Sequence, residues 1–82
     1  MRIKQLNANV RKQLAHFSLQ KKYHKQALLF TINPAHPSLN TEKLEPKTVG
    51  LYSFRIDRRY RAIFRIRVGQ AEILHITKHY QQ

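Results

Sequence analysis

From Leu51 onward, large apolar residues recur at every second position of the chain, which is the period of a β-strand. The alternation runs through the segment "LYSFRI", stops at residues 57–59, "DRR", and resumes through "YRAIFRIRV". Two alternating runs around a short polar interruption predict two antiparallel strands joined by a turn. This hairpin constrains the fold most, because its apolar face needs a covering layer.

The register of the hairpin follows from the pattern, since a slip of one residue would turn every side chain to the opposite face. Pairing Ile56 with Tyr60 gives one wholly apolar face. That face comprises Tyr52, Phe54, Ile56, Tyr60, Ala62 and Phe64. The other face then places Arg55 opposite Arg61. Pairing Asp57 with Tyr60 instead would mix apolar and charged residues on both faces, so we reject it.

Arginines that face each other across a strand pair repel, by a few tenths of a kcal/mol up to about 1 kcal/mol. A solvated face would more often mix Lys with Glu, whereas a phosphate between two guanidinium groups makes the pairing favourable. The segment "RIDRRYRAIFRIR" carries six arginines and a single acid, Asp57. We therefore expect Arg55 and Arg61 to form part of an anion site on the face turned away from the helices.

Two helices are expected before the hairpin. The first follows Asn7, a suitable N-cap, and carries apolar residues at helical spacing. Its apolar face comprises Val10, Leu14 and Phe17. The second covers residues 20–33 and ends at Asn33-Pro34, because the residue before a proline disfavours helical backbone. Its expected inward face comprises Tyr23, Ala27, Leu28 and Phe30.

A loop and a third strand complete the expected fold. Residues 34–50 contain three prolines and end in Gly50, which predicts a loop that Leu39 and Leu44 attach to the core. Residues 71–77, "AEILHIT", predict a strand after a turn at Gly69-Gln70. Residues 1–6 offer a short first strand or an unstructured lead. The fold class is therefore α+β, a single domain over residues 1–82 with an N-terminal helical hairpin packed on a small antiparallel sheet.

The register of the third strand has two alternatives. Pairing Phe64 with Leu74 sets His75 opposite Ile63, and His75 and His79 then share the arginine face. A slip by one residue sends both histidines toward the helices. The turn at Gly69 permits either register.

Net charge indicates the class of partner. Sixteen Lys plus Arg against four Asp plus Glu give the 82 residues a formal net charge of +12. Such a charge favours nucleic acid as a partner, then an acidic protein, and only last an anionic membrane. The absence of cysteine excludes disulfides and thiolate ligands and fits a reducing cytoplasm. No apolar run reaches the roughly 18 residues of a membrane span, and "MRIKQLNANVRK" lacks the apolar stretch of a signal peptide.

The segment "HPSLNTEKLEPKTVGLYSFRIDRRYRAIFRI", with the later "AEILHITKHY", resembles the RelE/ParE superfamily of bacterial type II toxins. In that superfamily a helical hairpin precedes a loop with a "KL" pair, and two strands carry "glySfRi…YRaiF". The resemblance covers residues 7–80 and is strongest over 36–66. The RelE-like branch, and within it the YoeB type, implies a ribosome-dependent mRNA endoribonuclease that inhibits translation without a cofactor. The ParE-like branch implies a protein that inhibits DNA gyrase by binding.

The resemblance also implies site residues. Glu42, Arg61, His79 and Tyr80 stand where the YoeB type has its catalytic Glu, Arg and C-terminal His-Tyr pair. Cleavage by the ribose 2′-hydroxyl needs a base, an acid and positive charge on the phosphate, and no metal. We expect Arg61 and Arg55 to supply the charge and His79 to act as acid or base. Glu42 is the alternative base, and Tyr80 can stack on a nucleobase or donate a proton.

Further basic residues are expected to bind the RNA backbone without sequence preference. These are Lys43, Lys47, Arg58, Arg59 and Arg65. The superfamily implies a cognate acidic antitoxin, through which alone the toxin would reach operator DNA. The histidines His16, His24, His36 and His75 show no metal-ligand spacing with nearby acids, so no metal site is expected. A non-catalytic nucleic-acid-binding module is the remaining alternative to the two toxin interpretations.

Overall fold

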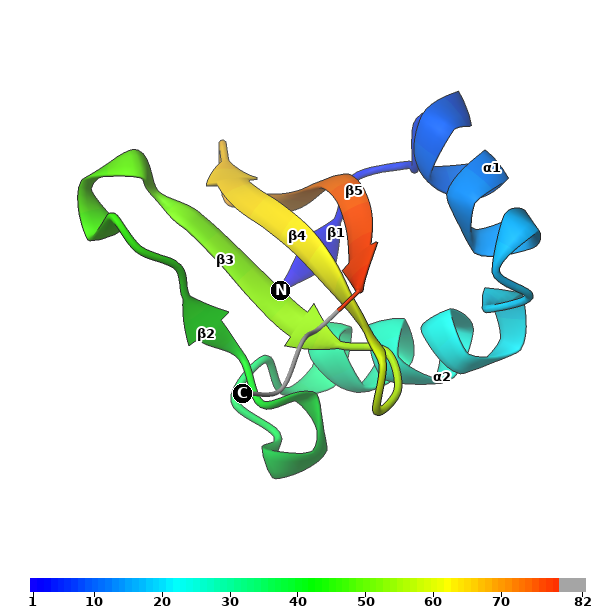
Figure 1. Ribbon diagram of the computed structural model, residues 1–82. Coiled ribbons are helices and arrows are strands. Elements are labelled where there is room, and N and C mark those ends of the chain that lie inside the picture. The colour runs from blue at the N-terminus through cyan, green and yellow to red at the C-terminus, as the bar shows by residue number, and fades with distance from the viewer. Residues whose placement is uncertain (79–82) are drawn as a thin grey trace.

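A five-stranded sheet with two helices behind it forms the computed structural model, which describes residues 1–78 (Figure 1). The strands lie in the order β1-β5-β4-β3-β2. The helices and strands are β1 (Arg2–Ile3), α1 (Ala8–His16), α2 (Gln20–Ile32), β2 (Glu42–Lys43), β3 (Leu51–Arg55), β4 (Tyr60–Arg67) and β5 (Gln70–Lys78). Two short 3₁₀ turns, η1 (Pro37–Leu39) and η2 (Lys47–Val49), lie on either side of β2. The α+β class predicted from the sequence is confirmed.

The β3–β4 hairpin has the predicted register. Its pairs are Leu51–Arg65, Tyr52–Phe64, Ser53–Ile63, Phe54–Ala62 and Arg55–Arg61. The turn is closed by Asp57, whose Oδ1 accepts the backbone N–H groups of Arg59 and Tyr60 at 2.8 Å each. An aspartate that bonds to the backbone two residues further on is a common way to stabilise a turn. The arginine-on-arginine pairing is therefore part of the folded structure.

The register of β5 agrees with the expected pairing as far as Ile63 and then departs from it. A shift between Ile63 and Phe64 places Ile73, and not Leu74, opposite Phe64. The expected Phe64–Leu74 pair was therefore wrong. Ile73 and Ile76 are both buried, and residues three apart cannot share a face of a regular strand. One extra residue in β5, a β-bulge, brings both side chains to the core.

The sheet is mixed and not wholly antiparallel. The short first strand forms, and β1 lies parallel to β5 with Arg2 opposite Gln70 and Ile3 opposite Ala71. The second departure is β2, which pairs antiparallel with β3 inside the expected loop. A strand of two residues carries too few positions for a hydrophobic period to be recognised.

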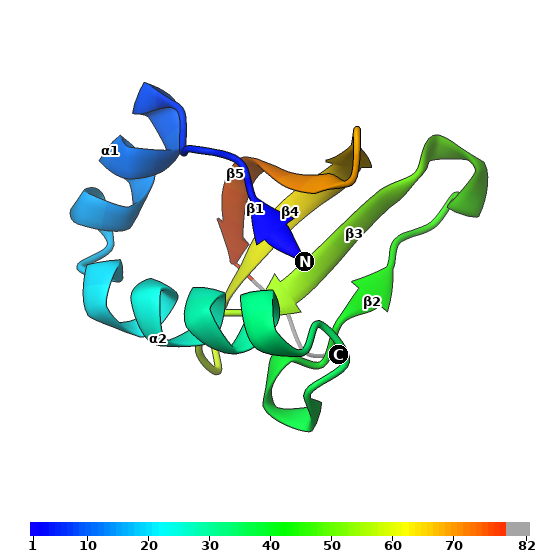
Figure 2. The same ribbon diagram turned by 180° about the vertical axis from the view of Figure 1, so that it is seen from behind.

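Asn7 caps α1 as predicted, because its Oδ1 accepts the N–H of Val10 at 2.8 Å. Figure 2 shows α1 beside β5 and α2 running across the back of the sheet toward the β3 end. The second helix ends at Asn33, whose extended backbone suits the following proline. Leu28 was expected to point inward and is instead 52% exposed. Neither helix of the described residues is long and apolar enough to cross a membrane.

Three phenylalanines form the centre of the core. Phe30 from α2 stacks on Phe54 at a centroid distance of 5.0 Å and meets the edge of Phe64 at 5.1 Å. All three are at most 2% exposed. Leu39, which is fully buried, fixes the 34–50 segment to this core as predicted. The apolar face of the hairpin is thus covered by α2, and the Arg55–Arg61 pair lies on the opposite face.

Candidate functional site

Arg61 is the most unusual residue of the sheet, because it is charged and only 3% exposed. It lies on β4, on the face opposite the phenylalanines, since its neighbour Ala62 points into the core. Its Nε donates to the hydroxyl of Ser53 at 2.8 Å. Its Nη2 donates to the backbone carbonyls of Asn40 and of Ser53. Neighbouring backbone and one hydroxyl therefore hold the guanidinium from one side.

Among residues 1–78, the Nη1 side of the guanidinium has no hydrogen-bond partner. Among the residues that the structure describes, the Nη1 atom of Arg61 is buried and makes no hydrogen bond. None of the ion pairs within residues 1–78 includes Arg61. Leaving a buried charged donor without an acceptor costs at least about 1–3 kcal/mol. A buried donor that residues 1–78 leave unpaired makes Arg61 a candidate site residue.

The charges around Arg61 are mixed. Burial lowers the pKa of its guanidinium, the carboxylate of Glu42 acts in the opposite direction, and the neighbouring Arg55 lowers the pKa further. An arginine nevertheless stays protonated in proteins. The positive charge is therefore compensated only in part, and an anionic oxygen near Nη1 would complete the compensation.

Glu42 reaches this face through β2, the strand that the sequence did not predict. Its cross-strand neighbour is Ser53, the residue that also holds Arg61. The Oε1 atom of Glu42 accepts a hydrogen bond from the side chain of Asn40 at 3.3 Å. Three of the five expected catalytic residues, Glu42, Arg55 and Arg61, thus lie on neighbouring strands at one face of the sheet.

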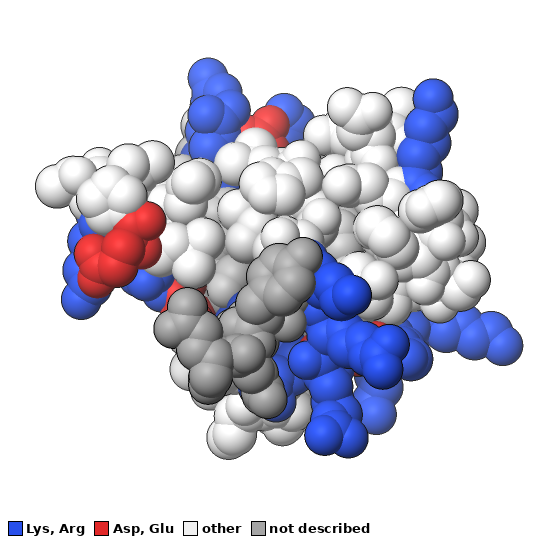
Figure 3. Space-filling model, in the orientation of Figure 1, with Lys and Arg blue, Asp and Glu red and all other residues white. Residues whose placement is uncertain are grey.

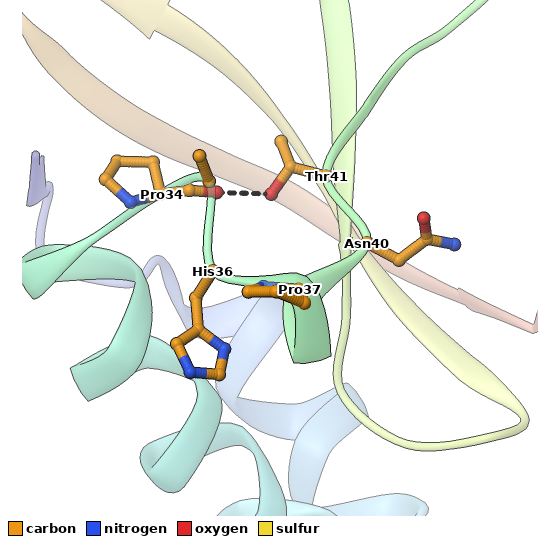
Figure 4. A pocket seen from close by; sticks show the side chains of 6 residues that line it. Pro34, His36, Pro37, Asn40 and Thr41 are labelled. Atoms are coloured by element: carbon orange, nitrogen blue, oxygen red, sulfur yellow. Dashed lines mark hydrogen bonds between the residues drawn. The ribbon is translucent and has the colours of Figure 1, made fainter.

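The loop before β2 is shaped to bring Asn40 to this face. Asn40 has left-handed backbone (φ 43°), which asparagine tolerates better than most residues. The hydroxyl of Thr41 donates to the carbonyl of Pro34 at 2.7 Å and closes the loop (Figure 4). Figure 4 also shows the pocket that this loop encloses, which is lined by Pro34, Ala35, His36, Pro37, Asn40 and Thr41.

Basic side chains gather at the end of the molecule where β3 turns into β4, as Figure 3 shows in blue around that turn. A shallow pocket of this region is lined by Lys22, Lys25, Gln26, Arg55, Ile56, Asp57 and Arg58. A second pocket on the other side of the turn includes Arg59 together with the paired rings of Phe17 and Tyr60, 4.8 Å apart. The only acid in either lining, Asp57, is engaged by Lys22 at 3.1 Å. We call this cationic surface the turn patch; its basic members are Lys22, Lys25, Arg55, Arg58 and Arg59.

The remaining expected RNA-binding residues lie apart from the turn patch. Lys43 is exposed on β2, with its Nζ 5.7 Å from the ring centroid of Tyr52. Lys47 is exposed in η2. Arg65 donates from Nε to Glu72 at 2.6 Å, and this bond lowers the pKa of the Glu72 carboxyl. Arg65 therefore already has an acidic partner, whereas Arg58 and Arg59 form no ion pair among residues 1–78.

Two expected catalytic residues, His79 and Tyr80, lie outside the described residues. The last described residue, Lys78, is opposite Tyr60, the neighbour of Arg61 on β4. His75 is exposed and lies opposite Ile63, on the arginine face, as the first of the two registers predicted. Within residues 1–78 no three His, Asp or Glu side chains gather as metal ligands would.

Sequence patterns did not indicate the residues that hold the site together. Ser53 and Gln26 are buried polar residues, and Asn40 acts through its backbone carbonyl. A serine inside the alternating run "LYSFRI" is the one available signal, because it interrupts large residues on a face that also carries Arg55. Lys22 and Lys25 join the turn patch only because α2 passes the β3–β4 turn.

No protein-family model matches the chain. A search of curated proteins likewise finds no match. Among solved structures, by contrast, several proteins superpose over nearly the whole chain.

The YoeB/ParE toxin from Agrobacterium tumefaciens is 16% identical, with a TM-score of 0.73 over 98% of this chain and 100% of that one. The heterotetrameric YoeB-YefM toxin-antitoxin complex from Staphylococcus aureus matches with 21% identity and a TM-score of 0.70, over 98% and 100%. The DinJ-YafQ complex from E. coli matches with 12% identity and a TM-score of 0.67, over 96% and 94%. The YoeB and YafQ chains are toxins of the RelE/ParE superfamily. At such identities the likeness concerns the fold, and the chain therefore has the fold of the RelE/ParE-superfamily toxins.

Proposed function

We propose that this protein is the toxin of a type II toxin-antitoxin system and that it inhibits translation by cleaving mRNA in the ribosome. The observation that carries the proposal is the buried guanidinium of Arg61, whose Nη1 atom has no hydrogen-bond partner within residues 1–78. This donor lies on the same face as Arg55 and Glu42. A buried donor beside a second arginine suits the binding of a phosphate group, whose oxygens accept hydrogen bonds from both guanidinium groups.

The proposed reaction is an attack of the ribose 2′-oxygen on the adjacent phosphorus. The P–O5′ bond breaks, and the products are a 2′,3′-cyclic phosphate and a free 5′-hydroxyl. Arg61 and Arg55 stabilise the extra negative charge of the phosphorane, and such preorganised donors act most strongly where water is excluded. Glu42 or His79 takes the proton from the 2′-hydroxyl. His79, or Tyr80 beside it in the sequence, gives a proton to the leaving oxygen.

The turn patch is proposed to bind the RNA backbone next to the scissile phosphate. It includes Arg58 and Arg59, and its member Arg55 pairs with Arg61 across the hairpin. Lys43 and Lys47 are proposed as further backbone contacts from β2 and η2. Contacts of this kind supply affinity that falls steeply with salt and carry little sequence preference.

An acidic antitoxin is the proposed protein partner. A net charge of +12 favours an acidic partner, and YoeB and YafQ, which have this fold, are seen in complexes with YefM and DinJ. The ribosome, mRNA and, through the antitoxin, operator DNA are the other proposed partners, and the cytoplasm is the proposed location. We propose no cofactor and no membrane partner.

Primer extension on an mRNA translated by purified ribosomes tests the proposal. The wild-type protein should cut within the codon that the ribosome presents. Arg61→Gln should reduce the cleavage rate about 100-fold or more, as expected for loss of one donor to a developing oxyanion. Arg67→Gln is the matched control, because it removes the same charge from an exposed position six residues along β4, roughly 20 Å away at about 3.3 Å per residue.

Two outcomes would reject this function. Intact mRNA together with inhibition of DNA gyrase would identify the ParE-like activity. This activity is the second candidate, because the similar Agrobacterium protein is named a YoeB/ParE toxin. RNA binding without cleavage by the wild-type protein on ribosomes would identify a non-catalytic nucleic-acid-binding module.

A further inference from the structure

The side chain of Arg61 is held by the backbone and the hydroxyl of one neighbouring residue and by one loop carbonyl. Ser53 contributes its Oγ to Nε at 2.8 Å and its carbonyl to Nη2 at 3.3 Å. The carbonyl of Asn40 is the third acceptor. Ser53 is fully buried at the middle of β3, between Glu42 on one side and Ile63 on the other. No other side chain among residues 1–78 forms a hydrogen bond with the guanidinium.

These acceptors leave one edge of the guanidinium buried and without a hydrogen-bond partner among residues 1–78. A guanidinium has five N–H donors in a rigid plane, so fixing Nε and Nη2 also fixes the direction of Nη1. Nη1 is the atom to which the described part of the chain offers no acceptor. If Nε were free, the side chain could rotate about its long aliphatic stem and turn another edge outward. The hydroxyl of Ser53 restrains this rotation at Nε, together with the two carbonyls that hold Nη2.

We infer that Ser53 is a positioning residue for Arg61 and that its hydroxyl aims Nη1 at a phosphate oxygen. This inference deepens the proposed function, because it names the group that makes Arg61 a directed donor and not merely a nearby charge. Ser53 acts through Arg61, because its fully buried hydroxyl accepts the Nε–H of that side chain. A misplacement of about 1 Å in a reacting group can reduce a rate about 100-fold, so a positioning hydroxyl has a large effect without any contact with RNA.

The local environment also explains why serine suits this position. The site needs an acceptor small enough to lie under a guanidinium in a strand pair with Ile63. Alanine would fit the same space but would leave the Nε–H of Arg61 buried without an acceptor. Threonine keeps the hydroxyl and is favourable in strands, but its additional methyl group has to be accommodated in the packed strand pair. Cysteine nearly keeps the volume but offers only a weak acceptor.

NMR of the arginine Nε–H groups measures the positioning directly. In the wild-type protein the Arg61 Nε–H should exchange slowly with water and should shift when inorganic phosphate is added. Arg65 provides an internal reference in the same spectra, because its Nε donates to Glu72 and not to Ser53. Assignment follows from the signal that disappears in Arg61→Lys.

Ser53→Ala should accelerate exchange at Arg61 Nε, leave Arg65 unchanged and weaken phosphate binding about tenfold. It should also lower kcat for mRNA cleavage about 10–100-fold with little change in KM, because the turn patch that binds the backbone is untouched. Ser53→Thr should recover most of the phosphate affinity and most of kcat. Thermal unfolding of each variant shows whether it is folded, and Ser53→Cys replaces Ser53→Ala if the alanine variant is not.

The inference and the proposed function fail in different ways. A Ser53→Ala protein that keeps the wild-type Arg61 signal and phosphate affinity would overturn the inference, whatever its activity. Changed NMR signals with an unchanged kcat would overturn it as well. If the wild-type protein binds phosphate at Arg61, and Ser53→Ala weakens that binding, but ribosomal mRNA is never cut, the proposed nuclease function fails and the positioning role stands.

Discussion

Gln26→Met should destabilise the protein although methionine matches glutamine in size and suits a helix. Gln26 lies on α2 and is 7% exposed. Its Nε2 donates to the carbonyl of Arg55 at 2.9 Å and to the carbonyl of Ser38 at 3.2 Å. One amide group therefore connects the helix, the loop that leads to Asn40, and the end of β3.

The magnitude follows from what the two carbonyls lose. A buried acceptor left without a donor costs about 1–3 kcal/mol. Ser38 is an exposed residue, so its carbonyl can recover a water molecule, whereas Arg55 is only partly exposed and its carbonyl recovers less. We therefore expect a loss near the lower end of the sum, about 2 kcal/mol. For a domain of 60–100 residues this corresponds to a fall in Tm of about 8–16 °C.

Urea and thermal unfolding monitored by circular dichroism would measure this effect. Gln20→Met is the matched control, because Gln20 is exposed in the first turn of the same helix. The control should change stability by no more than about 0.5 kcal/mol. If the two variants unfold within that margin of each other, the amide does not hold the loop and the strand end together, and the account of how Asn40 and Arg55 are positioned is wrong.

Three further predictions concern the turn, the surface and the core. Asp57→Ala should lower stability by about 1 kcal/mol at neutral pH, since two backbone N–H groups and Lys22 lose their acceptor. Burial raises the pKa of Asp57, but these hydrogen bonds outweigh it and the pKa lies below its ordinary value. The greater stability of the wild-type protein should therefore be present above about pH 4 and disappear as the pH falls through the folded pKa. Unfolding curves at several pH values would measure this dependence. The double variant Arg58→Gln, Arg59→Gln should weaken RNA binding and reduce the slope of log affinity against log salt by about 1–2, measured by fluorescence anisotropy, whereas equal slopes would remove the turn patch from the RNA interface. Phe30→Ala should cost about 3–5 kcal/mol, because Phe30 is 1% exposed and contacts two other rings, and a loss below 1 kcal/mol would contradict the described core.

The hairpin could be predicted from the sequence because two independent constraints coincide there. The alternation of large apolar residues with arginines distinguishes the two faces, and a turn that begins at Asp57 admits one register that keeps them apart. Every predicted pair of β3 with β4 is therefore present in the structure. The opposition of Arg55 and Arg61, the first indication of a site, follows from that register alone.

The parts that could not be predicted depend on contacts between distant segments. The bulge in β5 allows Ile73 and Ile76 to be buried in the core together. The sequence of the strand alone does not predict that both are buried. Leu28 fits the period of α2 and is nevertheless exposed. The polar Gln26 is buried because its side-chain amide donates to two backbone carbonyls. The burial of Arg61 was likewise not foreseen, since arginines on an outer sheet face are usually exposed.

The distribution of the few acids explains why the fold keeps so much uncompensated positive charge. Asp57 is occupied by the turn and Lys22, and Glu72 is paired with Lys4 and Arg65. Glu42 and Glu45 form no ion pair among the described residues, and of these two Glu42 raises the pKa of Arg61 through its charge. An anion that binds only the folded protein raises its stability by RT ln(1 + [L]/Kd), so every partner that supplies this charge also stabilises the fold. RNA and an acidic antitoxin, the two proposed partners, would satisfy the same electrostatic deficit, and each would therefore reduce the free energy that the other gains on binding.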